Sequence, residues 1–195
     1  IDPGDFSPVF LVGFPRSGTT LLDSILRGHP LVEILEEKTM IEKMNFYFQD
    51  SLKGQQDNLK NISDAHIKEL QKIYFSIAKE YLFINKKNNK IIIDKLPLNI
   101  KDVGFIHRIF PESKFIFVLR HPCDSVLSCF MNRFGMNNAM INFCTLYDTT
   151  KFYNKIMFLW KQYTTTLPIN YKIIKYEDII ENVEKSIKPL INFIN

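Results

Sequence analysis

Short apolar runs alternate along the chain with longer amphipathic stretches. Runs of this length predict buried strands of a parallel sheet. We expect strands at 8–14, 90–94, 114–119 and 171–175. Apolar residues spaced three and four apart predict helices between the strands. The expected helices cover 19–27, about 36–50, 63–81, 99–110, 122–133, 146–163 and 181 to the end.

Alternation of strands and helices indicates parallel pairing, with crossover helices on both faces of one sheet. We therefore expect an α/β fold of three layers, α/β/α, with a parallel sheet of at least four strands. A length of 195 residues suits a single domain, residues 1–195. Between the elements we expect a loop at 50–62, a turn at 86–90 and an irregular segment at 135–142.

Two of the expected helices have apolar faces that predict core contacts. In the helix at about 36–50 the apolar positions are Met40, Ile41, Met44, Phe46 and Phe48. In the helix at 146–163 the aromatic and apolar positions are Tyr153, Ile156, Trp160 and Tyr163. The first set is imperfectly periodic, whereas the second set has helical spacing and is expected to pack into the core.

Composition excludes several classes of protein. Hydrophobic residues make up 46% and charged residues 24%, so the chain can form a packed core and is not a disordered or coiled-coil protein. The net charge is only +4 with no dense basic run, which does not favour nucleic acid as a partner. No apolar run approaches the ~20 residues that cross a bilayer, and the first residues are not those of a signal peptide. Three cysteines without a CxxC pair indicate a reducing compartment, so we expect a cytoplasmic protein.

Cationic residues follow three of the expected strands. Arg16 follows the first, Lys95 the second and Arg120 the third. Ligands of open parallel sheets bind beyond the carboxyl ends of the strands. The three cations therefore predict an anion site at one edge of the sheet.

The segment after the first strand has the spacing of a phosphate-binding loop. Gly13 and Gly18 lie five positions apart, directly before a helix. The N-terminus of that helix and the hydroxyls of Ser17, Thr19 and Thr20 would donate hydrogen bonds to a tetrahedral anion. In a nucleoside triphosphatase a lysine would follow the second glycine, but here Thr19 does, and the positive charge comes from Arg16 within the loop.

Four motifs, in order along the chain, resemble those of sulfotransferases. Gly13–Leu22 (GFPRSGTTLL) is similar to their 5′-phosphosulfate loop, and Arg120–Ser128 (RHPCDSVLS) to their 3′-phosphate motif. Asp94–Asn99 (DKLPLN) and Tyr176–Asp178 (YED) also match. With Glu36 and Glu37, these motifs are most similar to the branch that contains tyrosylprotein sulfotransferases and bacterial sulfotransferases linked to tetratricopeptide repeats.

The resemblance implies a P-loop NTPase-like fold and an enzyme that moves a sulfuryl group from 3′-phosphoadenosine 5′-phosphosulfate to an acceptor hydroxyl or amine. The cations can neutralise the charge that develops on the bridging oxygen during in-line transfer. Because a sulfuryl group bears less charge than a phosphoryl group, a metal ion is not required. We expect this nucleotide as co-substrate and no metal. One sequence does not distinguish peptide, carbohydrate, lipid and small-molecule acceptors.

The resemblance also assigns roles to individual residues. Arg16, with the loop residues Ser17, Gly18, Thr19 and Thr20, would hold the 5′-phosphosulfate. Lys95 would be a second cation near the bridging oxygen. Arg120 and Ser128 would bind the 3′-phosphate, with Ser125 as a competitor to Ser128. Tyr176 would lie near the adenine.

The general base is left open between a carboxylate and an imidazole. The resemblance implies that Glu37 is the general base. An almost equal alternative is that Glu37 is only a charged residue at a helix start, where a negative charge is favourable. A carboxylate base suits a phenol better than an aliphatic alcohol, because a phenol loses its proton more easily. His29 and His121 are the alternative bases, although each precedes a proline and is expected to shape a turn.

Two features depart from the sulfotransferase pattern. Leu21 stands where the cytosolic branch has an adenine-stacking tryptophan. Sulfotransferases also continue past the position of Asn195 with a segment that closes over the nucleotide, so we expect a domain that is incomplete at its C-terminus and weakly active. The alternative functions are a P-loop nucleotide or small-molecule kinase, which Thr19 disfavours, and a non-catalytic nucleotide-binding fragment.

Overall fold

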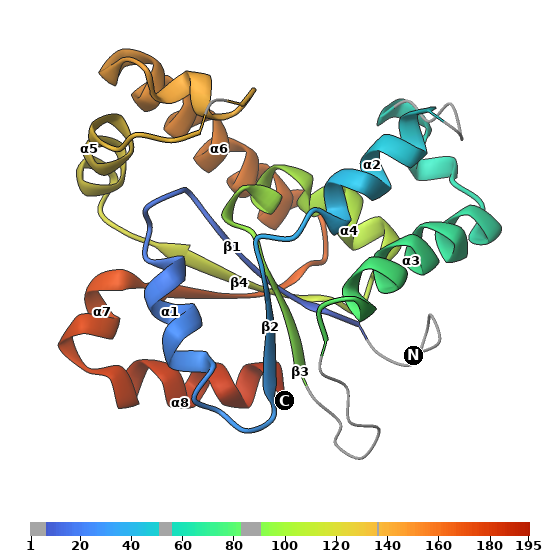
Figure 1. Ribbon diagram of the computed structural model, residues 1–195, viewed down its shortest axis with the longest axis horizontal. Helices are drawn as coiled ribbons and strands as arrows, with labels where there is room; N and C mark the ends of the chain where they lie inside the picture. Colours follow the sequence, from blue (N-terminus) through green and yellow to red (C-terminus); the bar gives the residue numbers. More distant parts are fainter. Residues whose placement is uncertain (1–6, 51–55, 83–90, 136) are drawn as a thin grey trace.

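A parallel β-sheet lies at the centre of the molecule (Figure 1). The computed structural model describes residues 7–50, 56–82, 91–135 and 137–195, and over these ranges the sheet has five strands in the order β2-β3-β1-β4-β5. Every neighbouring pair of strands is parallel. The strands are β1 (Val9–Gly13), β2 (Val32–Glu36), β3 (Ile91–Lys95), β4 (Lys114–Leu119) and β5 (Asn170–Lys175).

Helices connect the strands and cover both faces of the sheet. The α-helices are α1 (Thr19–Leu26), α2 (Met40–Asp50), α3 (Asp64–Lys79), α4 (Val103–Ile109), α5 (Pro122–Met131), α6 (Leu146–Thr166), α7 (Tyr176–Glu181) and α8 (Val183–Ile194). The 3₁₀-helices are η1 (Gln56–Asn61), η2 (Pro97–Asp102) and η3 (Met140–Phe143). None of the helices in the described ranges combines the length and the apolar character that crossing a membrane requires.

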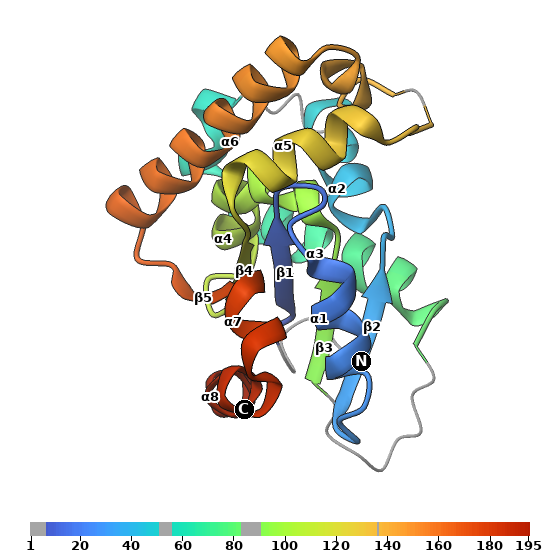
Figure 2. The same cartoon turned by 90° about the vertical axis from the view of Figure 1, so that its left-hand side faces the viewer.

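Alternate residues of each strand pack against opposite layers of helices. In β1, Val9 and Leu11 join the apolar core with α1, α7 and α8, whereas Phe10 and Val12 join the larger core with α2, α3, α4 and α6. Figure 2 shows α7 and α8 on the side of the sheet opposite α6. The prediction of a three-layer α/β/α fold with a parallel sheet of at least four strands is therefore confirmed.

The strand order places the loop after β1 at the point where the chain changes direction. From β1 the chain moves to β2 and β3 on one side of the sheet, and then crosses to β4 and β5 on the other side. Such a switch point leaves a crevice at the carboxyl ends of the strands, where ligands of this architecture bind. The fold thus presents the glycine loop at the position that favours a ligand.

The edge strand β2 was not among the sequence predictions. We expected a helix from about residue 36, but 32–36 is extended and α2 begins only at Met40. Val32 and Ile34 are buried in one core and Leu35 in the other, as a strand requires. The prediction was wrong because the charged residues from Glu36 onward read as the start of the following helix.

Other boundaries also differ from the predictions. The segment expected as a loop at 50–62 contains η1, and the expected turn at 86–90 lies outside the described residues. The helix expected at 99–110 is divided into η2 and α4, and the irregular 135–142 segment leads into η3. The final helix expected from 181 is α8, and the short helix α7 before it was not predicted. Such divisions depend on local hydrogen bonding that apolar periodicity does not reveal.

The core prediction for the helix at 146–163 is confirmed for Trp160, which is buried and stacks on Phe117 with a centroid distance of 4.5 Å, while Tyr163 is half-buried. On α2 the imperfect periodicity is explained by Phe46, because 70% of it is exposed. Its neighbours Met44 and Phe48, each two positions away, are buried, and a helix cannot direct all three positions to one face.

Candidate active site

A cavity of about 350 Å³ opens at the carboxyl edge of the sheet, beside the loop after β1. Among the described residues, its lining comes from five parts of the chain: the glycine loop, the residues that follow β2, β3 and β4, and two residues that follow α5. The lining residues are Pro15, Arg16, Gly18, Thr19, Thr20, Glu37, Leu96, Pro97, Leu98, Arg120, Phe134 and Met140. Six of the predicted site residues therefore meet in one cavity: Arg16, Gly18, Thr19, Thr20, Glu37 and Arg120.

The glycine loop turns sharply before α1. Gly18 is the N-cap of α1 with φ 101°, in a region of backbone conformation that favours glycine. Arg16 also has positive φ, 67°, which is unusual for a residue with a side chain and is found most often at functional sites. The first N–H groups of α1 have no acceptor within the helix, so the end of this loop suits an anion.

Two arginine side chains meet at the glycine loop: Arg16, which is part of the loop, and Arg120, which follows β4. The Nε atom of Arg16 donates a hydrogen bond to Ser128 Oγ on α5 at 3.1 Å. Arg120 Nη1 donates to the carbonyl oxygen of Arg16 at 3.2 Å. The structure thus brings Ser128 to the loop arginine, and it places Arg16, Arg120 and Ser128 in one cluster.

Tyr176 supports Arg120 and the loop together. The Arg120 guanidinium lies over the Tyr176 ring at 4.6 Å from the ring centroid. The same ring packs so closely on Gly18 that a Cβ atom there would overlap it. Among the described residues Arg120 Nε has no hydrogen-bond partner although it is buried, so this guanidinium retains donors for a ligand.

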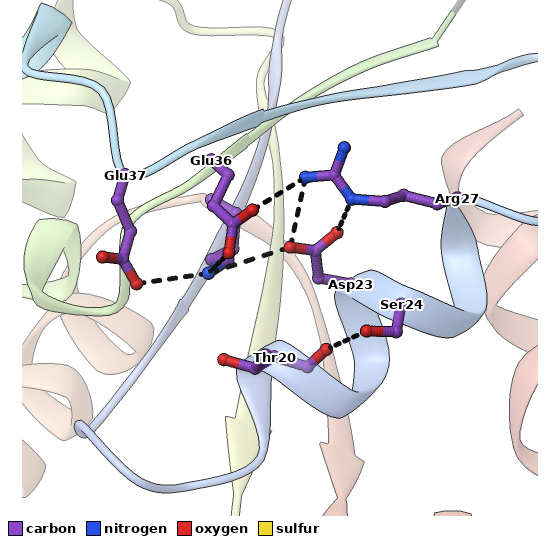
Figure 3. Close-up of polar contacts among 7 residues, drawn as sticks. Thr20, Asp23, Ser24, Arg27, Glu36 and Glu37 are labelled. Carbon is purple, nitrogen blue, oxygen red and sulfur yellow. Dashed lines mark hydrogen bonds and ion pairs between the residues drawn. The ribbon is translucent and has the colours of Figure 1, made fainter.

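Lys95 lies within a network of carboxylates and does not line the cavity. Its side chain is 0% exposed, and its ammonium is 2.9 Å from Glu36 Oε1, 3.2 Å from Glu37 Oε1 and 3.7 Å from Asp23 Oδ2. Asp23 on α1 contacts both this ammonium and Arg27, and Arg27 also contacts Glu36, as Figure 3 shows for the last three residues. Of the three predicted cations, Lys95 is therefore the one that is buried among three carboxylates, whereas Arg120 is 3.7 Å from the exposed carboxylate of Asp124.

Asp23, Arg27 and Glu36 were missed by the sequence predictions. Asp23 and Arg27 are four residues apart on α1, which in a sequence resembles an ordinary surface pair on a helix. The hydrogen bond from Lys95, followed by the charges of Lys95 and Arg27, lowers the pKa of the Glu36 carboxyl. Glu36 is therefore ionised at neutral pH.

Glu37 reaches the cavity because β2 ends beside β3. Its N–H donates to the carbonyl oxygen of Lys95 at 2.8 Å, and its φ of 50° turns the chain out of the strand. The carboxylate lines the cavity while one oxygen contacts Lys95. Glu37 thus lies at the end of a strand, and the alternative of a residue at a helix start is wrong because α2 begins at Met40.

The remaining candidates lie outside the cavity lining. Ser17 is 2% exposed, and its Oγ is close to the position that a Cβ on Gly13 would occupy. Ser125 is buried. The Nδ1 atom of His29 accepts a hydrogen bond from the Leu31 N–H within the turn before β2. His121 is the N-cap of α5. Each histidine thus takes part in a turn, as expected from the sequence.

The His121 turn is joined to the YED motif. The His121 N–H donates to Glu177 Oε1 at 2.8 Å, which ties the start of α5 to the start of α7. Burial raises the pKa of the Glu177 carboxyl, but the backbone hydrogen bonds of His121 and Glu177 and the charge of Arg120 outweigh it, and the pKa is lowered. Glu177 therefore holds together the two helix starts that flank Arg120.

A parallel sheet with a glycine loop between its central strand and the following helix defines a P-loop type of α/β protein. The sequence matches the family described as "Sulfotransferase family" over residues 8–195. The chain belongs to the sulfotransferase family, and the family resemblance predicted from the four motifs is confirmed.

Protein-tyrosine sulfotransferases are among the proteins that are similar to this chain in sequence, in agreement with the motifs. The chain is 24% identical to protein-tyrosine sulfotransferase 2 of Gallus gallus over 95% of its length and 50% of the relative. It is 25% identical to protein-tyrosine sulfotransferase 1 of Danio rerio over 98% of its length and 54% of the relative. The chain thus spans about half the length of these relatives.

Solved structures support the fold. The sulfotransferase domain from the curacin biosynthetic pathway superposes with a TM-score of 0.60 at 19% identity, covering 97% of this chain and 74% of that domain. The sulfotransferase domain of the Synechococcus PCC 7002 olefin synthase gives a TM-score of 0.56 at 19% identity, covering 99% and 76%. At these identities the similarity shows a common fold, which is the P-loop NTPase-like fold of sulfotransferases.

Proposed function

We propose that the protein transfers a sulfuryl group from 3′-phosphoadenosine 5′-phosphosulfate to a hydroxyl or amine of an acceptor. Membership of the sulfotransferase family supports this reaction. The observation that carries the proposal is the cavity, where Arg16, Thr19, Thr20 and Arg120 meet at the carboxyl edge of the sheet. Two arginines and the N-terminus of α1 match a donor that carries several negative charges.

The donor would lie across the loop with its two anionic groups held separately. Arg16, Thr19, Thr20 and the backbone at Gly18 would bind the 5′-phosphosulfate, and Arg120 with Ser128 would bind the 3′-phosphate. The Arg16–Ser128 hydrogen bond would then be exchanged for hydrogen bonds to the donor. Tyr176 would act through Arg120, whose guanidinium it supports, at the end of the site near the adenine.

Transfer would proceed in line without a metal ion. The acceptor oxygen or nitrogen attacks sulfur, the bond from sulfur to the bridging oxygen breaks, and 3′-phosphoadenosine 5′-phosphate leaves. Arg16 would stabilise the charge that develops on the bridging oxygen. Glu37, the carboxylate in the cavity lining, would take the acceptor proton.

We propose that Lys95 contributes to transfer by its positive charge and by holding the Glu37 carboxylate in position. Its ammonium contacts the Glu37 carboxylate at 3.2 Å and so fixes the orientation of the proposed base. A direct contact between Lys95 and the bridging oxygen stays a prediction. That contact would require the ammonium to exchange one of its carboxylate partners for the donor.

A transfer assay tests the proposed function. The chain is incubated with 3′-phosphoadenosine 5′-phosphosulfate and phenol or alcohol acceptors, and sulfated products are measured by mass spectrometry. We expect product formation that is lost in Arg16→Ala and preserved in Arg133→Ala, an exposed arginine that does not line the cavity. Magnesium-dependent turnover of ATP without sulfated product would support a kinase instead.

A further inference from the structure

Among the described residues, the part of the cavity lining that is not assigned to the donor is apolar apart from a single carboxylate. Arg16, Thr19, Thr20 and Arg120 are assigned to the donor. Apart from Gly18, the rest of the lining is Pro15, Leu96, Pro97, Leu98, Phe134, Met140 and Glu37. An acceptor that enters therefore meets hydrophobic side chains and one negative charge.

Lys95 does not offset that negative charge. Its buried ammonium is shared by Asp23, Glu36 and Glu37, and Arg27 is the other cation of this network. Three carboxylates against the two cations that contact them leave a formal charge of −1. Together with the hydrogen bond from Lys95, the charge of Lys38 also acts on Glu36 and lowers its pKa. Figure 3 shows Glu36 and Glu37 at the end of β2, and 59% of the Glu37 side chain is exposed.

Neighbouring cations on other elements do not line the cavity either. The Lys38 ammonium lies over the Tyr81 ring, 4.2 Å from its centroid. Arg133 precedes Phe134 but is itself absent from the lining residues. Within the described part of the chain, the cations that line the cavity are thus Arg16 and Arg120, and both are assigned to the donor.

We propose, building on the proposed sulfotransferase function, that this site selects acceptors with an apolar body and no negative charge near the reacting hydroxyl or amine, and prefers a cationic group there. An anionic acceptor would meet the Glu37 carboxylate and the anions of the donor without a lining cation left to pair with. Such like-charge contacts lower affinity for the wrong partner. The apolar lining provides contact area for an aromatic or aliphatic body.

Acceptors that share a framework and differ in the charge of their end group test this selectivity. The phenol series is tyramine, 4-ethylphenol and 3-(4-hydroxyphenyl)propionate, and the alkanol series is 6-aminohexanol, hexanol and 6-hydroxyhexanoate. In either series we expect kcat/KM to fall from the cation to the neutral compound to the anion, by about 3-fold at each step at low salt. The differences should shrink as ionic strength rises, because salt screens charges at the mouth of the cavity.

A positive charge added to the cavity lining should change the order of kcat/KM among these acceptors. Met140 is half-buried in the cavity lining, whereas Ile141, the next residue on η3, is 59% exposed and does not line it. We expect Met140→Lys to raise kcat/KM for the anion relative to the cation by about 3-fold to 10-fold. The matched control Ile141→Lys should leave this ratio within about 2-fold.

Three results would overturn the inference or the function beneath it. Equal kcat/KM for cation and anion, or a preference for the anion, would refute the acceptor assignment while leaving sulfuryl transfer intact. Transfer to none of the six compounds, with 3′-phosphoadenosine 5′-phosphate still bound in calorimetry, would refute the acceptor assignment and support a non-catalytic nucleotide-binding fragment. Failure to bind that nucleotide would refute the proposed function itself.

Discussion

Asp94 is a buried acid whose ionisation should make the stability of the fold depend on pH. It lies on β3 directly before Lys95 and is 0% exposed. The Tyr74 hydroxyl on α3 donates a hydrogen bond to Asp94 Oδ2 at 3.1 Å, while Oδ1 has no partner among the described residues. Burial raises the pKa of Asp94 to about 7, although the hydrogen bond from Tyr74 lowers it.

The direction of the effect follows from the two pKa values. In the unfolded chain the pKa of Asp94 is near 3.8, so between about pH 4 and pH 7 the folded state binds more protons. The free energy of unfolding therefore falls as pH rises through this window and levels off above about pH 7. Each pKa unit corresponds to 1.36 kcal/mol, so the whole shift corresponds to about 4 kcal/mol.

Urea unfolding of wild type and Asp94→Asn from pH 4.5 to 8 measures this contribution. The asparagine cannot ionise, so its stability relative to wild type should rise by about 1 kcal/mol per pH unit up to about pH 7. Asp64→Asn, at an exposed position of α3, is the control and should show a nearly constant difference from wild type. A constant difference for Asp94→Asn over the whole range would show that Asp94 is not a buried acid of raised pKa.

Two further substitutions test the loop and the core. Gly18→Ala should weaken the binding of 3′-phosphoadenosine 5′-phosphate by at least about 10-fold in calorimetry. The reason is that the new Cβ would overlap Tyr176 and that the residue has a positive φ. The control Gly135→Ala has open space around the new Cβ and should bind the nucleotide as wild type does. Unchanged binding by the Gly18 variant would contradict the packing of the loop. Trp160→Ala should cost about 3–5 kcal/mol of unfolding free energy in urea, against less than about 1 kcal/mol for Phe158→Ala on the exposed face of the same helix. Similar losses for the two variants would contradict the assignment of Trp160 to the core.

Much of the sheet could be predicted because its strands are nearly continuous apolar runs. The run Lys114–Leu119 is β4 without a change of boundary, and the runs that form β1, β3 and β5 differ by one or two residues. The edge strand β2 could not be predicted in this way. It contains Glu33 and ends at Glu36, so its five residues mix charged and apolar positions and run into a polar segment.

The shared position of the three cations at one sheet edge could be predicted from the sequence, whereas the Lys95 network could not. Strand ends predict that Arg16, Lys95 and Arg120 share one edge of the sheet, and parallel pairing of β1, β3 and β4 puts them there. The burial of Lys95 depends on Asp23 and Glu36, which come from α1 and β2. A local sequence pattern does not indicate contacts between elements that are distant in the sequence.

We propose that basic side chains that follow separate strands hold one adenosine nucleotide by its 3′-phosphate. Isothermal titration of 3′-phosphoadenosine 5′-phosphate and of 5′-AMP measures the contribution of that phosphate. We expect wild type and the control Arg133→Ala to bind the 3′-phosphorylated nucleotide about 10-fold to 100-fold more tightly than 5′-AMP, and Arg120→Ala to lose most of this difference. Equal affinity of the wild-type protein for the two nucleotides would refute a 3′-phosphate site at Arg120.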